Sequence, residues 1–440
     1  MTQKLIPLAD KHSRRDFLKT TATTAVGAGL AVGLEPVANV HAGGSDLIRV
    51  GLIGCGSPRG GRGRGAAENC VSAGPNVRLV AMGDLFRDHL EFTRTHLSRL
   101  GPEKVEVPEE RCFVGFDAYE KVINCKDVDL VLLTAPPHFR PSHLKAAVAA
   151  GKHVFAEKPV AVDAPGVRSV MQSCAEAKRR GLSIVSGLCW RYDRGMRETF
   201  RRIHDGAVGT IVAMQCTYNT GGLWMIPRQE GWSDMEWQLR NWLYFTWLSG
   251  DHNVEQHIHS LDKMAWAMHD EHPVRASGMG GRQVRTGPEY GHIFDHHSVV
   301  YEYANGVKLF SACRQQDGCA KDVTDHVFGT AGVCDVMRHV IHGQHPWRYR
   351  PEKNGKDAGM YQIEHNELIA SIRASKPINN GDYMCKSTMM AIMGRMATYT
   401  GRVITWEKAI NSSEDLSPQK YEFGPLAVAP VAMPGVTKFS

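Results

Sequence analysis

The sequence predicts an α/β protein of two domains, the first of which is built on a doubly wound parallel sheet. Its first half alternates short apolar strands with helical segments, and this alternation is typical of parallel strands joined by crossover helices. A chain of 440 residues also exceeds the size at which single cores stop growing. In the second half, strand patterns at 297–303 and 307–314 are joined at Asn305-Gly306, a signal for a type I′ hairpin.

The composition is that of a globular chain. Hydrophobic residues make up 42% and charged residues 22% of the sequence, and the formal net charge is +6. No Lys/Arg run with interleaved aromatic residues occurs, so nucleic acid is not expected as a partner. The cysteines, 11 in all, include no CxxC pair, which argues against a disulfide framework or a zinc ribbon.

Residues 1–42 have the features of an export signal. Residues 13–19 (SRRDFLK) form a twin-arginine pattern, residues 20–34 are mildly apolar, and residues 40–42 offer a small-residue cleavage pattern. The apolar stretch is shorter than the about 20 residues of a membrane-spanning helix, so an uncleaved anchor is the weaker alternative. Because the segment resembles Tat signals, we expect the Tat machinery to export the folded chain to the periplasm or another extracytoplasmic compartment.

A glycine-rich turn follows the first predicted strand. Residues 47–53 indicate a buried strand that leads into Gly54-Cys55-Gly56. The helix that starts after this region would direct its N–H groups and dipole at a pyrophosphate. Arg59 stands where GxGxxG requires the third glycine, so we interpret residues 57–60 as an insertion that displaces this glycine to Gly63. A simple surface loop is the alternative.

The second predicted strand, residues 77–84, ends in Asp84. A carboxylate at this point accepts hydrogen bonds from the adenosine ribose diol and repels a 2′-phosphate, which favours NAD over NADP. Arg87 follows three residues later and would stabilise such a phosphate. NADP therefore remains the alternative cofactor.

Two further motifs follow later strands. Ala135-Pro136-Pro137-His138 ends the strand that begins at residue 128, and Glu157-Lys158-Pro159 ends the strand at 152–156. With the glycine turn and Asp84, these motifs resemble the Gfo/Idh/MocA oxidoreductases. The resemblance implies an N-terminal Rossmann domain, a C-terminal α/β domain with a large, mainly antiparallel open sheet, and oxidation of sugar, inositol or related hydroxyls with NAD or NADP. The candidate cofactor-binding residues are Gly54, Gly56, Gly63, Asp84, Pro136, His138, Glu157 and Lys158.

The expected segments are a signal peptide at 1–42, a Rossmann domain at 47–188, a substrate-binding and oligomerisation domain at 189–422, and an extended tail at 423–440. An antiparallel sheet leaves one face free for a partner, so we expect a homo-oligomer. The tail contains three prolines and cannot form a regular helix. It would either embrace a neighbouring subunit or be disordered.

Lys158 is the first catalytic candidate. The resemblance places it near the nicotinamide and the substrate hydroxyl, and implies that the peptide before Pro159 is often cis. Independently of the resemblance, a partly desolvated ammonium stabilises a forming alkoxide, and it can transfer a proton when its pKa is lowered. A surface lysine in a turn is the alternative.

Segment 250–262 (GDHNVEQHIHSLD) has the densest polar chemistry in the sequence. If it were one helix, positions 251, 255, 259 and 262 would share a face. The segment resembles the family's DxxxHxxD pattern, which implies that His259 accepts or donates the proton and that the preceding acid reaches the substrate. Here Glu255 replaces the usual Asp, and His257 replaces a small residue. The candidate catalytic residues are Lys158, His259 and Glu255.

Two alternatives compete with this interpretation of the segment. A core histidine with satisfied hydrogen bonds would account for His259, and Asp262 would orient or cap rather than react. A metal site would draw on positions 252, 255, 257 and 259. That spacing is not HExxH, and a helix cannot point residues 257 and 259 the same way. We therefore expect no metal.

Aromatic and histidine-rich segments supply candidates for the substrate pocket. Residues 224–247 are rich in tryptophan, on which sugar rings stack well, and an ordinary packed core is the alternative. Residues 290–297 (YGHIFDHH) form a second histidine cluster. The candidate substrate-binding residues are Arg191, His257, Asp262, Tyr290 and His292.

Export and redox chemistry together constrain the function. Because no dependable supply of dissolved NAD exists outside the cytosol, the cofactor must stay bound and be restored within each cycle. We expect an oxidoreductase that acts on a sugar or polyol, similar to the exported glucose-fructose oxidoreductases. The alternatives are redox-neutral cleavage of a glycoside substrate, as in NAD-dependent glycosidases, and a non-catalytic carbohydrate or nucleotide sensor.

Overall fold

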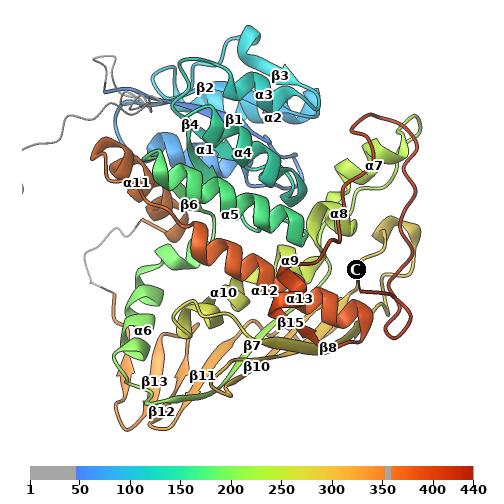
Figure 1. Cartoon of the computed structure of the whole chain (residues 1–440). Helices are drawn as coiled ribbons and strands as arrows, with labels where there is room; N and C mark the ends of the chain where they lie inside the picture. Colours follow the sequence, from blue (N-terminus) through green and yellow to red (C-terminus); the bar gives the residue numbers. More distant parts are fainter. Residues whose placement is uncertain (1–45, 352–357, 440) are drawn as a thin grey trace, which may run out of the picture. The chain divides into compact units, whose positions relative to one another are not determined.

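Two sheets organise the chain in the computed structural model, which describes residues 46–351 and 358–439 (Figure 1). The predicted signal at 1–42 lies outside these residues. Across the described ranges, no helix has the length and apolar character needed to cross a membrane. The described ranges fall within one compact unit, Gly43–Ser440.

The first sheet consists of six parallel strands in the order β3-β2-β1-β4-β5-β6. The strands are β1 (Ile48–Ile53), β2 (Val77–Asp84), β3 (Cys112–Val114), β4 (Leu130–Leu133), β5 (His153–Ala156) and β6 (Ile184–Ser186). β4 is apolar and fully buried, as expected of a strand covered on both faces. The order reverses between β1 and β4, which opens a crevice at the carboxyl ends of these strands. The predicted Rossmann sheet is confirmed.

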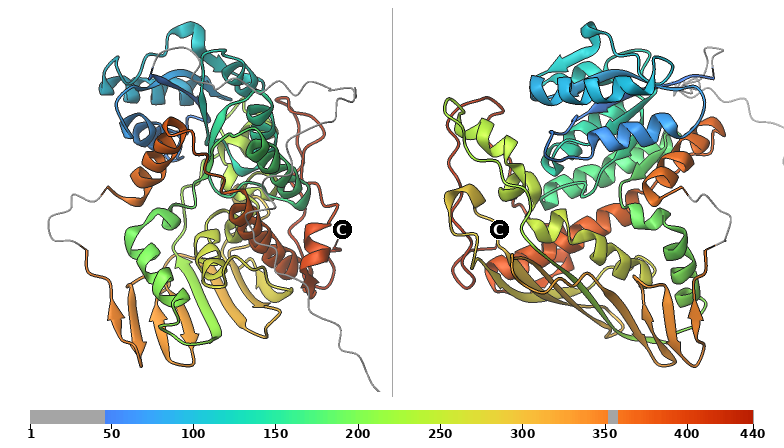
Figure 2. Two further views of the ribbon diagram at one scale, coloured as in Figure 1. Left: turned by 60° about the vertical axis from the view of Figure 1, so that its left-hand side comes forward. Right: turned by 180° about the vertical axis from the view of Figure 1, so that it is seen from behind.

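Helices cover both faces of this sheet (Figures 1 and 2). In the described part of the chain, the connections between its strands contain α1 (Gly63–Ser72), α2 (Arg87–Leu97), α3 (Ala118–Ile123), α4 (Arg140–Ala149) and α5 (Ala164–Arg179). The sequence explains individual helix starts. At α5, for example, the Asp163 carboxylate accepts a hydrogen bond from the Gly166 N–H, and a proline stands in the first turn, where its missing N–H costs nothing.

The second sheet consists of nine strands in the order β14-β13-β12-β11-β7-β10-β9-β8-β15. Its strands are β7 (Ile211–Thr220), β8 (Arg275–Gly281), β9 (His296–Glu302), β10 (Lys308–Gln315), β11 (Asp325–Gly329), β12 (Gly332–Asp335), β13 (Val340–Gly343), β14 (Trp347–Arg348) and β15 (Ile404–Thr405). Only β7 and β10 pair in parallel among these neighbours. The expected mainly antiparallel open sheet is therefore present.

The β9–β10 hairpin differs from its prediction in its turn. Tyr303 and Val307 still pair through a backbone hydrogen bond of 2.9 Å, so the loop between them has three residues instead of two. Gly306 has φ of 86°, whereas Asn305 is not among the residues with positive φ. A type I′ turn needs positive φ at both central residues, and a three-residue loop needs it only at its last position.

One face of the second sheet is packed under helices. Alternate residues of β9 and β10 are buried. α12 (Gly381–Thr400) packs on β8 and β9, α10 (Ile258–Ala267) packs on β7 and β11, and α6 (Arg194–His204) packs on α10. Figure 2 shows α10 and α12 between the two sheets. The nearly complete burial of α12 follows from this position, because it contacts both β8 and α5.

The chain returns to the first sheet after completing most of the second. α11 (Met360–Arg373) packs on α1. Just beyond it, the Ile378 carbonyl accepts a hydrogen bond of 2.7 Å from the Ile184 N–H in β6. Residues from the predicted domain at 189–422 thus extend the edge of the Rossmann sheet. The predicted domains are consecutive segments of the sequence, so they did not include this return of the chain.

Residues 411–439 follow α13 (Trp406–Ile410) and form neither helix nor strand; we call them the C-terminal arm. The arm runs beside α7 (Asp234–Arg240) (Figure 1). The Gly424 carbonyl accepts a hydrogen bond from the Met235 N–H at 3.1 Å, and the Gly435 N–H donates to the Thr400 carbonyl at 2.9 Å. The described tail is thus ordered against its own chain, and the proposed disorder is not found there.

Candidate active site

A cavity of about 480 Å³ lies at the carboxyl ends of the parallel strands, where Rossmann folds bind their ligands. Its walls come from the segments that follow β1, β2, β3, β4 and β5, and from residues 218–259 and Tyr361 of the second half. Eight of the predicted residues line it, namely Gly54, Gly56, Asp84, Pro136, Glu157, Lys158, Glu255 and His259.

The glycine turn after β1 fits the close approach of a dinucleotide. Gly54 and Gly56 have φ of 92° and 81°, a region that side chains disfavour. α1 begins at Gly63, and a Cβ there would overlap the Gly54 carbonyl oxygen. Gly63 therefore does not line the cavity but lets the helix start against the turn, which is the role of a third glycine.

The predicted insertion folds as a small closed loop. The Ser57 N–H donates to the Gly60 carbonyl at 2.7 Å, and the Gly60 N–H donates back to Ser57 at 3.2 Å. Because this loop closes on itself, α1 can begin three residues later without changing the geometry of the first two glycines. The loop lines the cavity at Ser57 and Gly60 without filling it.

Asp84 joins the end of β2 to the glycine turn. One carboxylate oxygen accepts a hydrogen bond of 2.6 Å from the Cys55 N–H, and the other accepts one of 2.9 Å from the Phe86 N–H. Its carboxylate lines the cavity where the ribose diol of a dinucleotide would lie. Arg87, the residue that kept NADP open, pairs with Glu109 at 2.9 Å and is not part of the lining. The glycine cradle and the acid together fit NAD.

Lys158 points into the cavity from the loop after β5. Its Nζ donates to the Glu255 backbone carbonyl at 2.7 Å and to the Glu255 carboxylate at 3.0 Å. Both side chains are mostly buried, with 13% and 15% exposed. The Lys158–Pro159 peptide is cis. The two predicted catalytic residues, from distant parts of the sequence, are thus in direct contact.

His259 lies at the same end of the cavity. Burial, with the nearby charge of Lys158, lowers the pKa of His259 well below 6.5, so its imidazole is neutral at physiological pH. Its Nδ1 is buried and has no hydrogen-bond partner among the described residues. A neutral imidazole that lines a substrate cavity can accept a proton from a substrate hydroxyl.

Segment 250–262 is not one helix. α9 (His252–Glu255) ends at Gln256, and α10 begins at Ile258. Both the Gln256 N–H and the His257 N–H donate to the His252 carbonyl at 3.0 Å, so the chain turns there. Because of this turn, Glu255 and His259 still face the cavity, whereas Asp251 and Asp262 do not line it. The expectation that these residues share one continuous face was wrong.

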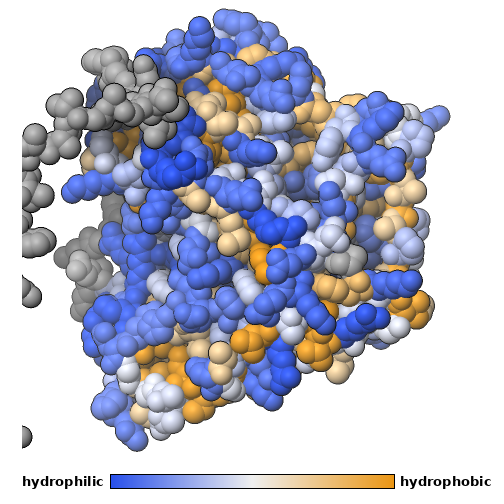
Figure 3. Space-filling view, viewed as in Figure 1, coloured by the Kyte–Doolittle hydropathy of each residue, from blue (hydrophilic) through white to orange (hydrophobic). Residues whose placement is uncertain are grey.

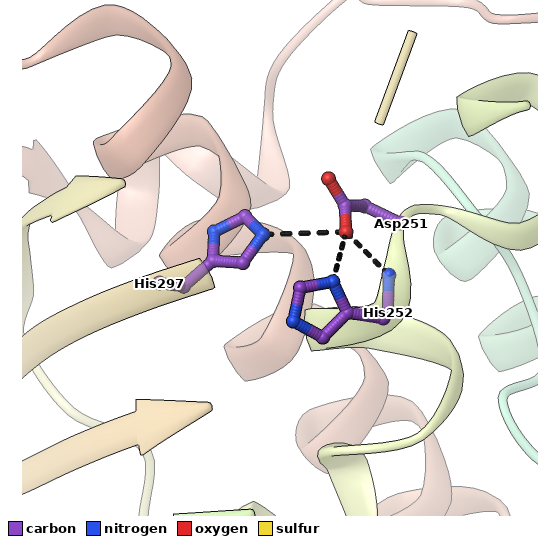
Figure 4. Close-up of side chains that lie close together, drawn as sticks. All are labelled: Asp251, His252 and His297. Atoms are coloured by element: carbon purple, nitrogen blue, oxygen red, sulfur yellow. Dashed lines mark hydrogen bonds and ion pairs between the residues drawn. The ribbon is translucent and has the colours of Figure 1, made fainter. Parts of the chain in front are cut away.

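Asp251 belongs to a buried cluster with His252 and His297 (Figure 4). Its Oδ1 lies 2.9 Å from His252 Nδ1 and 3.2 Å from His297 Nε2. Its Oδ2 accepts hydrogen bonds from the Phe294 N–H at 2.9 Å and the Tyr399 hydroxyl at 2.6 Å. Protein donors therefore satisfy both carboxylate oxygens.

The metal set weighed from the sequence does not come together. Among the described residues, the cluster of Asp251, His252 and His297 is the only group of three possible ligands that converge. His257 instead lies 2.7 Å from the Ser311 hydroxyl, in the core, while Glu255 and His259 line the cavity. The expected absence of a metal remains a prediction.

The predicted substrate-binding residues lie away from the cavity, and the structure corrects their placement. Arg191 binds Asp262 through a forked pair of 2.8 and 3.0 Å and also pairs with Asp270 at 2.6 Å. These are structural ion pairs of the second half, because all three guanidinium nitrogens donate to carboxylates. The cavity lining includes none of the five predicted substrate-binding residues, which are Arg191, His257, Asp262, Tyr290 and His292.

His138 is the predicted cofactor-binding residue that is displaced from the cavity. Its Nε2 lies 2.7 Å from the Tyr421 hydroxyl of the C-terminal arm, and its ring packs edge-on against Trp247. Burial lowers the pKa of His138 to about 4. His138 is thus a neutral contact between the Rossmann loop and the arm.

The aromatic segment 224–247, a candidate for the pocket, supplies two lining residues. Trp224 and Trp242, 5.8 Å apart, line the cavity, while Trp237 belongs to the packed core. Other cavity residues were not anticipated, among them Tyr218 from β7. Arg140 is 5% exposed, lines the cavity and donates to the Pro159 carbonyl at 2.6 Å. The position of Arg140 just after the proline loop that ends β4 could have indicated this role. Tyr361 reaches the cavity from α11, and no sequence pattern indicated that it would.

Comparison with known proteins identifies the fold and cofactor. Residues 48–185 match the model of the Gfo/Idh/MocA oxidoreductase family, described as an NAD-binding Rossmann fold. The matched residues span the Rossmann sheet from β1 into β6. The enzyme is accordingly an NAD-dependent oxidoreductase.

Individual Gfo/Idh/MocA relatives extend beyond this domain. The chain is 25% identical over 294 residues to an inositol 2-dehydrogenase of Klebsiella pneumoniae, covering 65% of this chain and 73% of the relative. It is 29% identical over 218 residues to a glycosyl hydrolase family 109 protein of Solibacter usitatus, covering 48% and 46%. The structure of an aldose-aldose oxidoreductase from Caulobacter crescentus aligns with a TM-score of 0.63 at 18% identity, covering 82% and 99%. This last similarity shows that the two-domain fold is shared.

Proposed function

We propose that this protein oxidises a hydroxyl of a sugar or polyol and restores its NAD with a second substrate while the cofactor stays bound. The observation that carries the proposal is the contact of Lys158 with Glu255 beside His259, at the end of the cavity that follows β5. When bound, NAD supplies the acceptor for the hydrogen that leaves the substrate carbon with its electron pair. The chain has to manage the hydroxyl proton.

Each of the three residues at the reacting end of the cavity has its own role in the transfer of the hydroxyl proton. The neutral imidazole of His259 accepts it from the substrate hydroxyl. The Lys158 ammonium stabilises the negative charge that develops on the oxygen, because the site is largely buried and water screens the charge poorly. Glu255 orients Lys158 through two contacts, one from its carboxylate and one from its backbone carbonyl. In the reverse step the same residues return the proton.

The aromatic wall supports a cyclic polyhydroxylated substrate. Trp224 and Trp242 line the cavity, the Trp224 indole lying close to Gly60 of the glycine-rich loop, and their apolar faces suit the C–H faces of a sugar or inositol ring. The relative named inositol 2-dehydrogenase and the fold neighbour named aldose-aldose oxidoreductase act on substrates of this kind. The assay with pairs of sugars described below would identify the individual substrate.

The location proposed for this protein requires that the cofactor stays bound. We propose that residues 1–42 direct Tat export to the periplasm, where free NAD is not supplied. Protein purified without added cofactor should release about one NAD per chain on denaturation, measured by mass spectrometry. Supplied with pairs of sugars and no free cofactor, it should oxidise one sugar and reduce the other. Denatured protein without dinucleotide, together with no conversion of any pair, would overturn the proposal.

Cleavage of a glycoside is the second candidate. It is favoured by the 29% identity to a glycosyl hydrolase family 109 protein. Transient oxidation at C3 would acidify the C2 proton, elimination would release the aglycone, water would add, and reduction would restore C3. Incubation with glycosides in deuterated water distinguishes the two. Deuterium at C2 of a released sugar supports elimination, and cleaved products without it exclude this route.

We further propose that the open face of the second sheet pairs with another copy of the chain. Phe310 of β10 and Met279 of β8 point away from the helices and are 50% and 74% exposed. Figure 3 shows hydrophobic residues along the lower edge of the view, over this sheet. Apolar side chains of this size on a regular sheet are typical of an interface.

A further inference from the structure

The C-terminal arm lies against the wall of the cavity that faces the adenosine end of the cofactor site. Asp84 marks this end, because the carboxylate after the second strand binds the adenosine ribose. Phe86 follows Asp84 by two residues, and Phe116 follows the neighbouring strand β3. Both rings line the cavity.

Arm residues cover these rings from outside. Phe423 stacks on Phe86 with ring centroids 6.0 Å apart and an interplanar angle of 18°, and lies 5.4 Å from Phe116. Tyr421 packs 6.1 Å from Phe116 and 6.0 Å from Phe139, a third lining residue. The arm itself contributes no lining residue, so it supports the wall from behind.

Phe86 is held by α7 as well as by the arm. The guanidinium of Arg240 in α7 lies 3.8 Å from the Phe86 ring centroid. Arg240 is fixed in turn by Asp88 at 3.0 Å and Glu236 at 3.0 Å. Although it stands in a loop at the end of a strand, Phe86 is only 7% exposed. Its burial depends on residues far along the chain.

Polar contacts fix the arm to both halves of the protein. On the Rossmann side, the Leu416 N–H donates to Asp163 at 3.1 Å, and the Tyr421 hydroxyl lies 2.7 Å from His138. On the other side, the Leu426 carbonyl accepts a hydrogen bond of 2.8 Å from the Gln238 side chain in α7. The arm therefore runs from the loops after β4 and β5, past the rings of Phe86 and Phe116, to α7, and this wall cannot open unless the arm separates or bends.

We propose that residues 415–426 of the C-terminal arm are a clasp that slows release of the dinucleotide by keeping the Phe86 and Phe116 wall closed. The proposal deepens the retained cofactor proposed above, on which its biological purpose rests. It concerns binding alone, since neither Phe423 nor Tyr421 lines the cavity that holds Lys158. The clasp should therefore alter cofactor dissociation and leave the chemical step unchanged.

Dissociation of NADH tests the clasp directly. Full-length protein loaded with NADH would be mixed with excess NAD, and the loss of NADH fluorescence would give the dissociation rate. The variants are F423A, Y421A and a deletion of residues 418–440. V431A is the matched control, since Val431 is an exposed apolar residue of the same arm. Circular dichroism and thermal unfolding would verify that each variant folds.

We expect the dissociation rate to rise about tenfold in F423A and Y421A and further in the deletion variant, with V431A unchanged. An increase of less than threefold in the dissociation rate of both F423A and Y421A would overturn the proposal. These two single variants decide the question if the deletion variant does not fold. An equal increase in V431A would also overturn it, because the effect would then not reside in the clasp. If the NADH dissociation rates change as expected but neither wild type nor any variant turns over a sugar, the proposed function is refuted and the clasp remains supported.

Discussion

The Lys158 ammonium lies 3.0 Å from the Glu255 carboxylate and 2.7 Å from the backbone carbonyl of the same residue. The two residues come from the loop after β5 and the end of α9, so this contact joins the Rossmann sheet to the second half at the reacting end of the cavity. A single residue thus sets both the position and the charge environment of the proposed catalytic amine.

Glu255→Gln removes the charge of this contact and keeps the shape. Because the pair is mostly buried, we expect kcat/KM to fall by about 10²-fold, while the dissociation constant for NADH stays within twofold. Steady-state kinetics and fluorescence titration measure the two quantities. Glu198→Gln is the control, since Glu198 forms an ion pair with Arg201 on the surface of α6. Activity of the Glu255 variant within threefold of wild type would contradict the proposed role.

Gly63→Ala tests the displaced third glycine. A Cβ at this position overlaps the Gly54 carbonyl oxygen, so we expect a loss of about 2–3 kcal/mol in the free energy of unfolding and weaker NADH binding by at least tenfold. Gly65→Ala is the matched control in the same helix, because its Cβ would approach only the end of the flexible Arg62 side chain, at 3.1 Å. Chemical denaturation should show no loss there, since alanine favours helix over glycine by about 1 kcal/mol. Equal destabilisation by both would exclude the assignment.

His365→Leu tests the acid sensitivity of the core. His365 is fully buried on α11 against Phe155, and neither ring nitrogen has a hydrogen-bond partner among the described residues. Burial, with a smaller effect of Arg62, lowers the pKa of His365 from 6.5 to about 3. The unfolded chain therefore binds a proton below pH 6.5 that the folded chain does not, so stability is complete above pH 6.5 and falls as the pH decreases toward 3.

At pH 5 this difference amounts to about 2 kcal/mol for one such histidine. The free energy of unfolding, measured with denaturant at pH 7.5 and pH 5, should thus fall by about 2 kcal/mol less in the leucine variant than in wild type. Replacement of the exposed His345 by Asn should leave the wild-type difference unchanged. An unchanged pH dependence in the leucine variant would show that His365 does not titrate on unfolding.

Phe310→Asp with Met279→Asp tests the proposed self-association. Two carboxylates on the open face of the second sheet would have to be desolvated on pairing, so we expect light scattering to give an oligomer for wild type and a monomer for the double variant. NADH binding should be retained, since neither residue lines the cavity. A wild-type monomer, or an oligomer that survives both substitutions, would exclude this face as the interface.

The sequence by itself determined the elements whose signals are local. Strand alternation, the glycine turn, the acid at the end of β2 and the motif after β5 each occupy a few consecutive residues, and the close approach of backbone to backbone at Gly54 and Gly63 allows only glycine. For these reasons the Rossmann sheet, its crevice and Lys158 could be placed before the structure was known.

Tertiary structure decided which polar residues reach the cavity. A spacing of four residues indicates a shared face only if the helix continues, and the turn at Gln256 breaks it. Asp251 is then held by donors from Phe294 and Tyr399, residues that no local pattern connects with it. The same holds for the arm that covers Phe86, because a contact between residues more than 300 positions apart depends on how both halves of the chain pack, and neither segment encodes that packing alone.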